Sequence, residues 1–339
     1  MSVLYFLKHA RKVLFFVIVI STQTLFSRTL NEGINQHHEI TLYFITSTGK
    51  IKWDNPSKLL KSTNLAYLKA TLKGNSYVIG HTHARITSAL LDAPLYTGMV
   101  GAVHSDKADL ILKKKVGLGS LGATIRGKME TEESIKSGLK RYGKMNMVSY
   151  IKFKINATAV QRILHFINYY GQKTECGFAP CEKYNGALWP RYEKEGSGCS
   201  AFVMTLLDVA NIVPPESKEW MVDINVPMNL IGGESNNNKK IKFSSILSTK
   251  SWYNGNGIEG VDFVNYKVFD PSIIKEWILN KRNQNDSLFV ADEEDGLKGV
   301  IIDRRNVLCD LNDPIIKQRT DTTLFVKHYY KLIGCQKPE

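Results

Sequence analysis

The most informative stretch of the chain is residues 184–210, with the sequence YNGALWPRYEKEGSGCSAFVMTLLDVA. Its first half is rich in glycine and polar residues, which is typical of a loop. After Cys199 the apolar residues recur at spacings of three and four, the period of a helix with one buried face. The stretch therefore predicts a loop that leads into a helix, with Ser197 or Gly198 as the cap and Cys199 in the first turn.

A cysteine in the first turn of a helix has an unusual chemical environment. The positive end of the helix dipole and the unpaired backbone N–H groups both favour the thiolate, and they can also bind an oxyanion. The alternative is that Cys199 is a small buried apolar residue, as most lone cysteines are. Position in the helix leaves both interpretations open.

The residues around Cys199 resemble the nucleophile segment of the NlpC-type papain-like cell-wall cysteine peptidases. In that family a Tyr-Gly-Gly loop and a proline precede Asp-Cys-Ser-Gly-Phe-Val on the catalytic helix. The matching residues here are Tyr184, Gly186, Pro190 and the run Gly198-Cys199-Ser200-Ala201-Phe202-Val203, roughly 20 of the 339 residues. Gly198 and Ala201 replace the family's aspartate and glycine.

The resemblance implies an α+β fold in which a papain-like core of antiparallel strands packs on the cysteine-bearing helix. It implies that Cys199 is the nucleophile. It also places Tyr184, Gly198 and Ser200 beside the thiol, where they are candidates for oxyanion or substrate binding.

Two histidines lie on a predicted strand at residues 77–87, which is rich in β-branched residues. Alternation along the strand places His81, His83 and Arg85 on one face. A zinc site needs three or four ligands, and no further ligand lies at a short spacing, so we expect no metal and no cofactor. By resemblance, Gly80-His81 matches the histidine strand of papain-like folds, with His81 as the base and His83 as the reserve candidate on the cleft face.

The order of the two catalytic candidates is reversed, because His81 precedes Cys199 whereas the family usually has cysteine before histidine. Reversed order resembles the circularly permuted branches, which include peptidases, lipid-handling enzymes and the lecithin retinol acyltransferase group. In those branches a polar residue on the next strand orients the histidine. The next strand-like run is residues 98–104, so His104 is the candidate; the alternative is a surface histidine at a strand end.

The composition is that of a globular protein, with 43% hydrophobic and 23% charged residues among 339. The net charge of +13 favours anionic partners such as an envelope polymer or a lipid surface. No basic groove interleaved with aromatic residues is visible, so we expect no nucleic acid. The sequence does not predict the oligomeric state.

The first residues predict export, because Lys8, Arg11 and Lys12 precede a short apolar run at residues 13–20. We expect a signal peptide at residues 1–27, which could also remain uncleaved as a membrane anchor. A catalytic domain is expected at residues 28–230. Residues 231–339 form a C-terminal extension of the same or an associated domain, with no recognisable chemistry of its own.

Export changes what is expected of the five cysteines, because disulfides persist outside the cytoplasm. Cys176 and Cys181 flank a short turn and are one candidate pair; Cys309 and Cys335 are the other. This pairing leaves Cys199 free. The alternative is that none of them pair.

The favoured function is an exported, periplasmic or secreted cysteine hydrolase that cleaves amides such as those of peptidoglycan peptides. Cys199 would attack the carbonyl, His81 would carry the proton, and His104 would orient the imidazole. An acyl ester or lipid hydrolase or acyltransferase is a second choice. A non-catalytic envelope protein of the same fold is the rival, and Gly198 favours it.

Overall fold

The computed structural model describes residues 37–284, 286–321 and 323–334. The expected signal peptide at residues 1–27 lies outside them, as does Cys335. The side chains of His104 and Ser105 are also outside the described part. No helix in the described ranges has the length and apolar character that a bilayer span needs.

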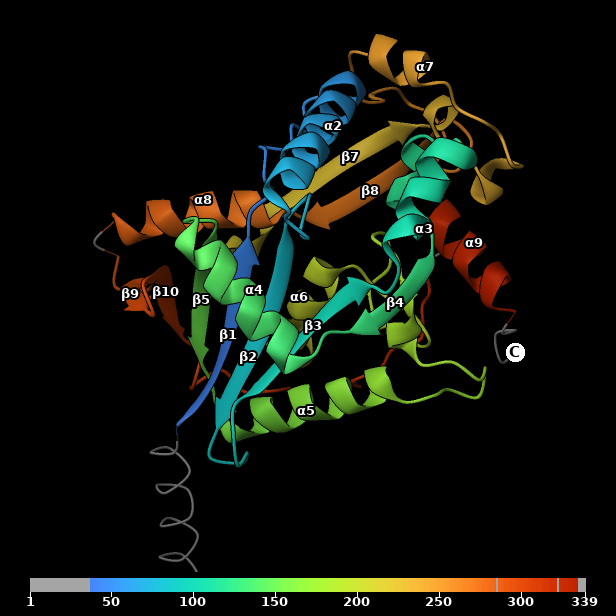
Figure 1. Cartoon of the computed structure of the whole chain (residues 1–339). Helices are drawn as coiled ribbons and strands as arrows, with labels where there is room; N and C mark the ends of the chain where they lie inside the picture. Colours follow the sequence, from blue (N-terminus) through green and yellow to red (C-terminus); the bar gives the residue numbers. More distant parts are fainter. Residues whose placement is uncertain (1–36, 285, 322, 335–339) are drawn as a thin grey trace, which may run out of the picture.

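The chain folds as an α+β protein around a large mixed sheet (Figure 1). Its eight strands run in the order β6-β4-β3-β2-β1-β5-β10-β9. Their bounds are β1 (His38–Ile45), β2 (His81–Ser88), β3 (Leu95–Gly101), β4 (Ile125–Met129), β5 (Val148–Lys154), β6 (Lys183–Tyr184), β9 (Val290–Glu294) and β10 (Leu297–Asp303). A second sheet pairs β7 (Met221–Pro227) with β8 (Phe263–Phe269).

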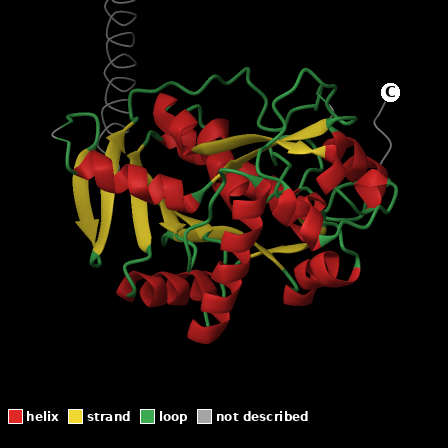
Figure 2. Ribbon diagram, turned by 90° about the horizontal axis from the view of Figure 1, so that it is seen from above, coloured by secondary structure: helices red, strands yellow, loops and turns green. Residues whose placement is uncertain are grey.

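Helices cover both faces of the large sheet, as Figures 1 and 2 show. The α-helices are α2 (Pro56–Lys73), α3 (His104–Ala108), α4 (Glu132–Lys144), α5 (Ala157–Gly171), α6 (Cys199–Val209), α7 (Phe243–Ser248), α8 (Pro271–Arg282) and α9 (Leu324–Ile333). The expected helix after Cys199 is confirmed, with Gly198 as its N-cap. The side chain of Asn156 caps α5, because it accepts the backbone N–H of Ala159 at 2.9 Å.

One strand pair differs from the expected antiparallel core. β10 runs parallel to β5, while every other neighbouring pair in the large sheet is antiparallel. Parallel neighbours require a long crossover connection. Here the chain between β5 and β10 passes through α5, α6 and α8 before it returns to the sheet.

The register of β1 and β2 shows which side chains lie on each face of the sheet. Leu42 pairs with Ala84 and packs into the main core, where residues of α5, α6 and α8 meet. Tyr43 pairs with His83, and its side chain packs in a separate cluster with Tyr142 of α4. Side chains alternate along a strand, so His83 and the α4 helix share one face while α6 lies behind the other.

Residues on either side of position 230 share both sheets. β7 pairs with β8, and β10 pairs with β5. The expected catalytic domain at residues 28–230 and extension at residues 231–339 therefore build the same sheets.

Neither expected disulfide forms, because Cys181 and Cys309 are free thiols. Cys181 is the middle residue of a tight turn at Pro180–Glu182 and packs into the main core. The Sγ of Cys309 donates to the carbonyl oxygen of Ala210 at 3.2 Å. Cys176 is disulfide-bonded, but not to Cys181. The short spacing between Cys176 and Cys181 in the sequence could not show that the side chain of Cys181 packs into the core.

Candidate active site

Cys199 is the first residue of α6 and is a free thiol with 9% of its surface exposed. The backbone N–H of Phe202 bonds to the carbonyl oxygen of Gly198, which starts the helix. The N–H groups of the first turn have no intrahelical acceptor. The thiol therefore lies beside backbone donors that an oxyanion could use.

A loop held by buried hydrogen bonds delivers Cys199 to this position. Asn185 is buried; its side-chain amide donates to the carbonyl oxygen of Gly122 and accepts from the backbone N–H of Ala187, both at 2.8 Å. Its neighbour Tyr184 places its hydroxyl 3.9 Å from the sulfur of Cys199. Tyr184 therefore contacts the thiol, and its role in oxyanion or substrate binding stays a prediction.

His81 is the first residue of β2 and is 3% exposed. Gly80, just before it, has a φ of +95°, and a side chain there would lie 3.1 Å from the carbonyl oxygen of Ile45. This glycine lets the chain turn sharply into the strand. The His81 ring interacts with the thiol of Cys199, and this interaction shifts the pKa of both groups. The structure thus brings together the two residues that the sequence singled out as nucleophile and base.

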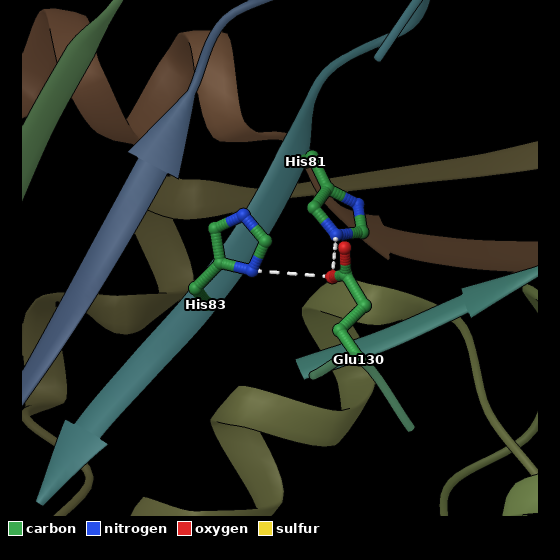
Figure 3. Close-up of side chains that lie close together, drawn as sticks. All are labelled: His81, His83 and Glu130. Atoms are coloured by element: carbon green, nitrogen blue, oxygen red, sulfur yellow. Dashed lines mark hydrogen bonds and ion pairs between the residues drawn. The ribbon is translucent and has the colours of Figure 1, made fainter. Parts of the chain in front are cut away.

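Glu130 holds the two histidines from the loop between β4 and α4 (Figure 3). Its Oε2 lies 2.6 Å from Nε2 of His81 and 3.2 Å from Nδ1 of His83. The side chains of Glu130 and His81 are each 4% exposed, so water competes little for this contact. Because Nε2 of His81 is bound to Glu130, Nδ1 is the nitrogen left for the thiol.

Tyr77 fixes the imidazole of His81 from the side. The two rings stack with centroids 4.1 Å apart and planes 9° apart. The hydroxyl of Tyr77 also donates to Oε1 of Glu130 at 2.7 Å. Tyr77 is itself held by Tyr142 of α4, whose hydroxyl accepts the backbone N–H of Tyr77 at 3.1 Å. Stacking and hydrogen bonding together restrict the orientation of the His81 ring.

The charges at the site favour a thiolate–imidazolium pair. Burial raises the pKa of the Cys199 thiol, but the charge and hydrogen bond of His81 outweigh it and lower the pKa to about 6. Burial lowers the pKa of His81, but the Cys199 thiolate and Glu130 outweigh it and raise the pKa to about 9. Between these values the thiol is ionised and the imidazole is protonated.

Glu130 and His83 complete the electrostatic arrangement. Burial raises the pKa of Glu130, but its close contacts with His81 and His83 outweigh it and lower the pKa well below its usual range. Burial and the charge of His81 lower the pKa of His83 to about 4. At neutral pH the carboxylate is therefore ionised and His83 is neutral, so Glu130 faces one charged imidazole and one neutral imidazole.

The same three side chains could hold a metal ion. His81, His83 and Glu130 offer three donor atoms that lie within 4.8 Å of one another. Two histidines and a glutamate suit a catalytic zinc site. However, the 2.6 Å between His81 and Glu130 is a hydrogen-bond distance, whereas two ligands of a tetrahedral zinc ion lie about 3.3 Å apart. The geometry as it stands favours the ion pair.

The other predicted site residues have different outcomes. Gly198 caps α6, and a side chain there would make an ordinary van der Waals contact with the Cα of Gly186, at 3.5 Å. Ser200 is buried in the first turn of α6. His104 begins α3 instead of ending a strand, and its side chain lies outside the described residues. The side chain that contacts Nε2 of His81 belongs to Glu130.

Glu130 and Tyr77 were not predicted from the sequence. Glu130 lies just before α4, which begins at Glu132 after the cap residue Thr131. The helix signal was present, since Thr131 is a good cap followed by two acidic residues. That signal places Glu130 before the helix, at the end of β4, where a side chain can turn into the sheet.

Comparison with known proteins assigns no family to the chain. No family model matches it, and neither a curated protein nor a solved structure does.

Proposed function

We propose that this protein is a cysteine hydrolase of papain-like design, in the permuted order, that acts outside the cytoplasm on amide bonds of cell-envelope substrates such as peptidoglycan peptides. The observation that carries the proposal is the buried arrangement of Cys199, His81 and Glu130. A nucleophile, a base bonded to it, and a third group that orients the base are the parts that acyl transfer requires.

The geometry supports a two-step reaction. The Cys199 thiolate attacks the carbonyl carbon, and the oxyanion is stabilised by backbone N–H groups at the start of α6 and by the hydroxyl of Tyr184. The imidazolium of His81 then gives its proton to the leaving amine as the C–N bond breaks, which leaves a thioester. Neutral His81 next takes a proton from water, whose oxygen attacks the thioester and releases the acid and the Cys199 thiolate, which restores the thiolate–imidazolium pair. Glu130 holds the tautomer and orientation of His81 throughout.

The envelope substrate rests on the resemblance around Cys199 and on the export signal expected from the sequence. The amide is preferred because an imidazolium already in place can protonate a poor leaving group such as an amine. Acyl esters remain the alternative within the same chemistry.

The test uses purified peptidoglycan, with release of new amine termini as the measurement. Cys199→Ala and His81→Ala should each lose nearly all activity, because nucleophile and base act as a unit. His165→Ala is the control, since His165 is exposed on α5. Full activity in Cys199→Ala would show that Cys199 is not the nucleophile and would contradict the proposal. Activity of the wild type on acyl esters but not on peptidoglycan would instead support the ester hydrolase.

A metal-dependent hydrolase is the second candidate, because His81, His83 and Glu130 lie within ligand reach of one another. Metal content of the purified protein separates the two. A metal-dependent enzyme would carry about one ion per chain, lose activity to a chelator, and keep activity in Cys199→Ala. The cysteine hydrolase would keep activity in chelator and lose it in Cys199→Ala.

A further inference from the structure

Lys107 brings a positive charge to the thiol from the short helix α3. Its Nζ lies 4.8 Å from the centroid of the Tyr184 ring. The hydroxyl of the same tyrosine lies 3.9 Å from the sulfur of Cys199. Lys107 also interacts electrostatically with the Cys199 thiolate. One aromatic ring therefore contacts both the nucleophile and a lysine ammonium.

This ammonium has no carboxylate partner among the described ion pairs. The adjacent acid, Asp106, forms an ion pair with Arg126, with 2.8 Å between Oδ1 of the aspartate and Nη2 of the arginine. Lys107 is only partly exposed, and burial lowers the pKa of its ammonium while the Cys199 thiolate partly opposes the shift. A cation that has lost part of its hydration without gaining a carboxylate partner is stabilised by a carboxylate that arrives with a ligand.

We propose that Lys107 recognises a negatively charged group of the substrate, a carboxylate close to the carbonyl that Cys199 attacks. This inference rests on the proposed function and narrows it to acidic amide substrates. The Tyr184 face holds the ammonium in place through a cation–π contact, so the side chain is already positioned when the substrate enters.

The test compares two alkylating reagents of similar size at Cys199, iodoacetate, which is anionic, and iodoacetamide, which is neutral. Both replace iodide with the thiolate sulfur, so their rate ratio reports the charge near the thiol. Mass spectrometry of the Cys199 peptide separates its rate from those of Cys181 and Cys309, the other free thiols of the described residues. We expect Lys107→Gln to lower the iodoacetate-to-iodoacetamide ratio about fivefold, and Lys107→Arg to retain most of it.

Lys183→Gln is the matched control. This variant removes one positive charge from the residue next to Tyr184. The Nζ of Lys183 lies 4.9 Å from the centroid of the Phe178 ring, whereas that of Lys107 lies over the Tyr184 ring. The reagent ratio in Lys183→Gln should stay at the wild-type value. An unchanged ratio in Lys107→Gln overturns the inference. An equal fall in both rates also overturns it, because Lys107 would then only support Tyr184.

The two proposals fail separately in this experiment. If wild-type Cys199 reacts with iodoacetamide no faster than free glutathione, the hydrolase proposal fails, and the reagent ratio still tests Lys107. If Cys199 reacts fast but the reagent ratio is unchanged in Lys107→Gln, only the proposal that Lys107 binds a substrate carboxylate is contradicted.

Discussion

At the scale of single residues, the reactivity of Cys199 depends on its pairing with His81. The thiol pKa of about 6 and the imidazole pKa of about 9 are set by each other. Cys199 and His81 could be proposed from the sequence because the short segments around them resemble those of a known family. Glu130 could not, because its contact with His81 spans 49 positions and depends on how β4 and β2 are placed on either side of β3.

The first prediction is a bell-shaped pH profile for kcat/KM. Activity should rise as the thiol ionises near pH 6 and fall as His81 loses its proton near pH 9. In His81→Asn the thiolate loses its cation, so the midpoint of iodoacetamide labelling at Cys199 should move up toward about 8.5. A midpoint that stays near 6 in this variant would show that His81 does not activate the thiol.

The second prediction concerns Glu130 as a positioning residue. Glu130→Gln keeps a side chain of the same shape but removes the charge that helps raise the pKa of His81. We expect kcat/KM to fall by about 10- to 100-fold, and the alkaline limb of the profile to move to lower pH. Glu133→Gln on the exposed surface of α4 is the control. If activity falls but the limb stays fixed, Glu130 has only a structural role.

The third prediction is that His83 makes the protein sensitive to acid. Its pKa is about 4 in the folded protein and about 6.5 when unfolded. The stabilisation is therefore complete above pH 6.5 and is lost as the pH falls toward 4, because only the unfolded chain takes up the proton. Between pH 7 and 5 this amounts to about 2 kcal/mol.

Urea unfolding at pH 7 and pH 5 measures this effect. His83→Gln should lose less stability between the two values than the wild type, whereas His165→Gln on the surface of α5 should behave like the wild type. An equal pH dependence in wild type and His83→Gln would contradict the assignment.

At the scale of elements, the pairing of β2 with β3 leaves space for the side chains of the site. Gly98 of β3 pairs with His83 of β2. A Cβ at Gly98 would lie 2.9 Å from Nδ1 of His83 and 3.0 Å from Oε2 of Glu130. Helix periodicity predicted α6 from the sequence, because that signal is local. The need for glycine at position 98 could not be predicted, because it arises from the register of two strands and from a residue beyond them.

The fourth prediction follows from this close approach. Gly98→Ala should push Glu130 away from the histidines, reduce kcat/KM by at least tenfold and cost about 1–3 kcal/mol of stability. Gly101→Ala in the same strand is the control, because its Cβ would meet only the end of the Ile125 side chain, at 3.3 Å. Equal activity in the two variants would show that the site tolerates the shift.

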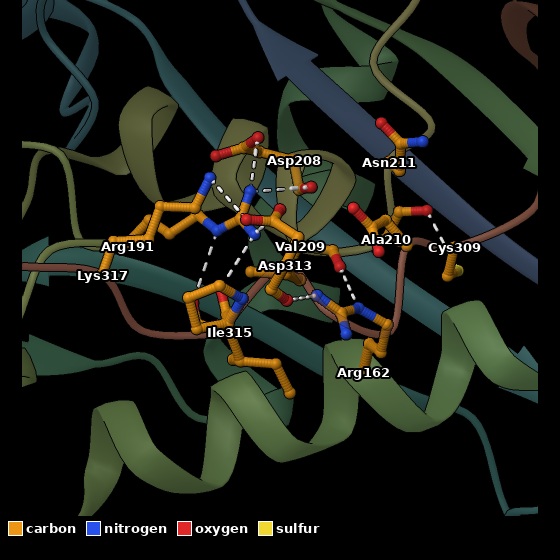
Figure 4. Close-up of polar contacts among 12 residues, drawn as sticks. Arg162, Arg191, Asp208, Val209, Ala210, Asn211, Cys309, Asp313, Ile315 and Lys317 are labelled. Carbon is orange, nitrogen blue, oxygen red and sulfur yellow. Dashed lines mark hydrogen bonds and ion pairs between the residues drawn. The ribbon is translucent and has the colours of Figure 1, made fainter.

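At the scale of the whole molecule, the C-terminal part holds the loop that precedes Cys199. Arg191 in this loop is buried and bonds to Asp208 of α6 and to Asp313 (Figure 4). Glu195 is fully buried and accepts from Arg319, with 2.8 Å between its Oε2 and Nη2. Sequence analysis found no chemistry in residues 231–339, because ion pairs between distant segments leave no local pattern. Through these ion pairs, residues 231–339 hold the loop that leads to Cys199.

The fifth prediction is that the pair of Glu195 and Arg319 couples the C-terminal segment to the site. Arg319→Met leaves the Glu195 carboxylate buried with only Tyr330 and the backbone N–H of Trp189 as donors. Removing one partner of a buried pair costs about 3–5 kcal/mol. Adding Glu195→Gln should restore part of the loss, because the double variant no longer buries a charge.

Urea unfolding of the single and double variants, with activity measured on the folded fraction, tests the coupling. Arg305→Met is the control, because the pair of Arg305 and Asp303 is about half exposed and should contribute within about 0.5 kcal/mol. If Arg319→Met is no more destabilising than Arg305→Met, the C-terminal segment does not anchor the loop. If stability falls while activity per folded molecule is unchanged, the segment stabilises the fold without positioning Cys199.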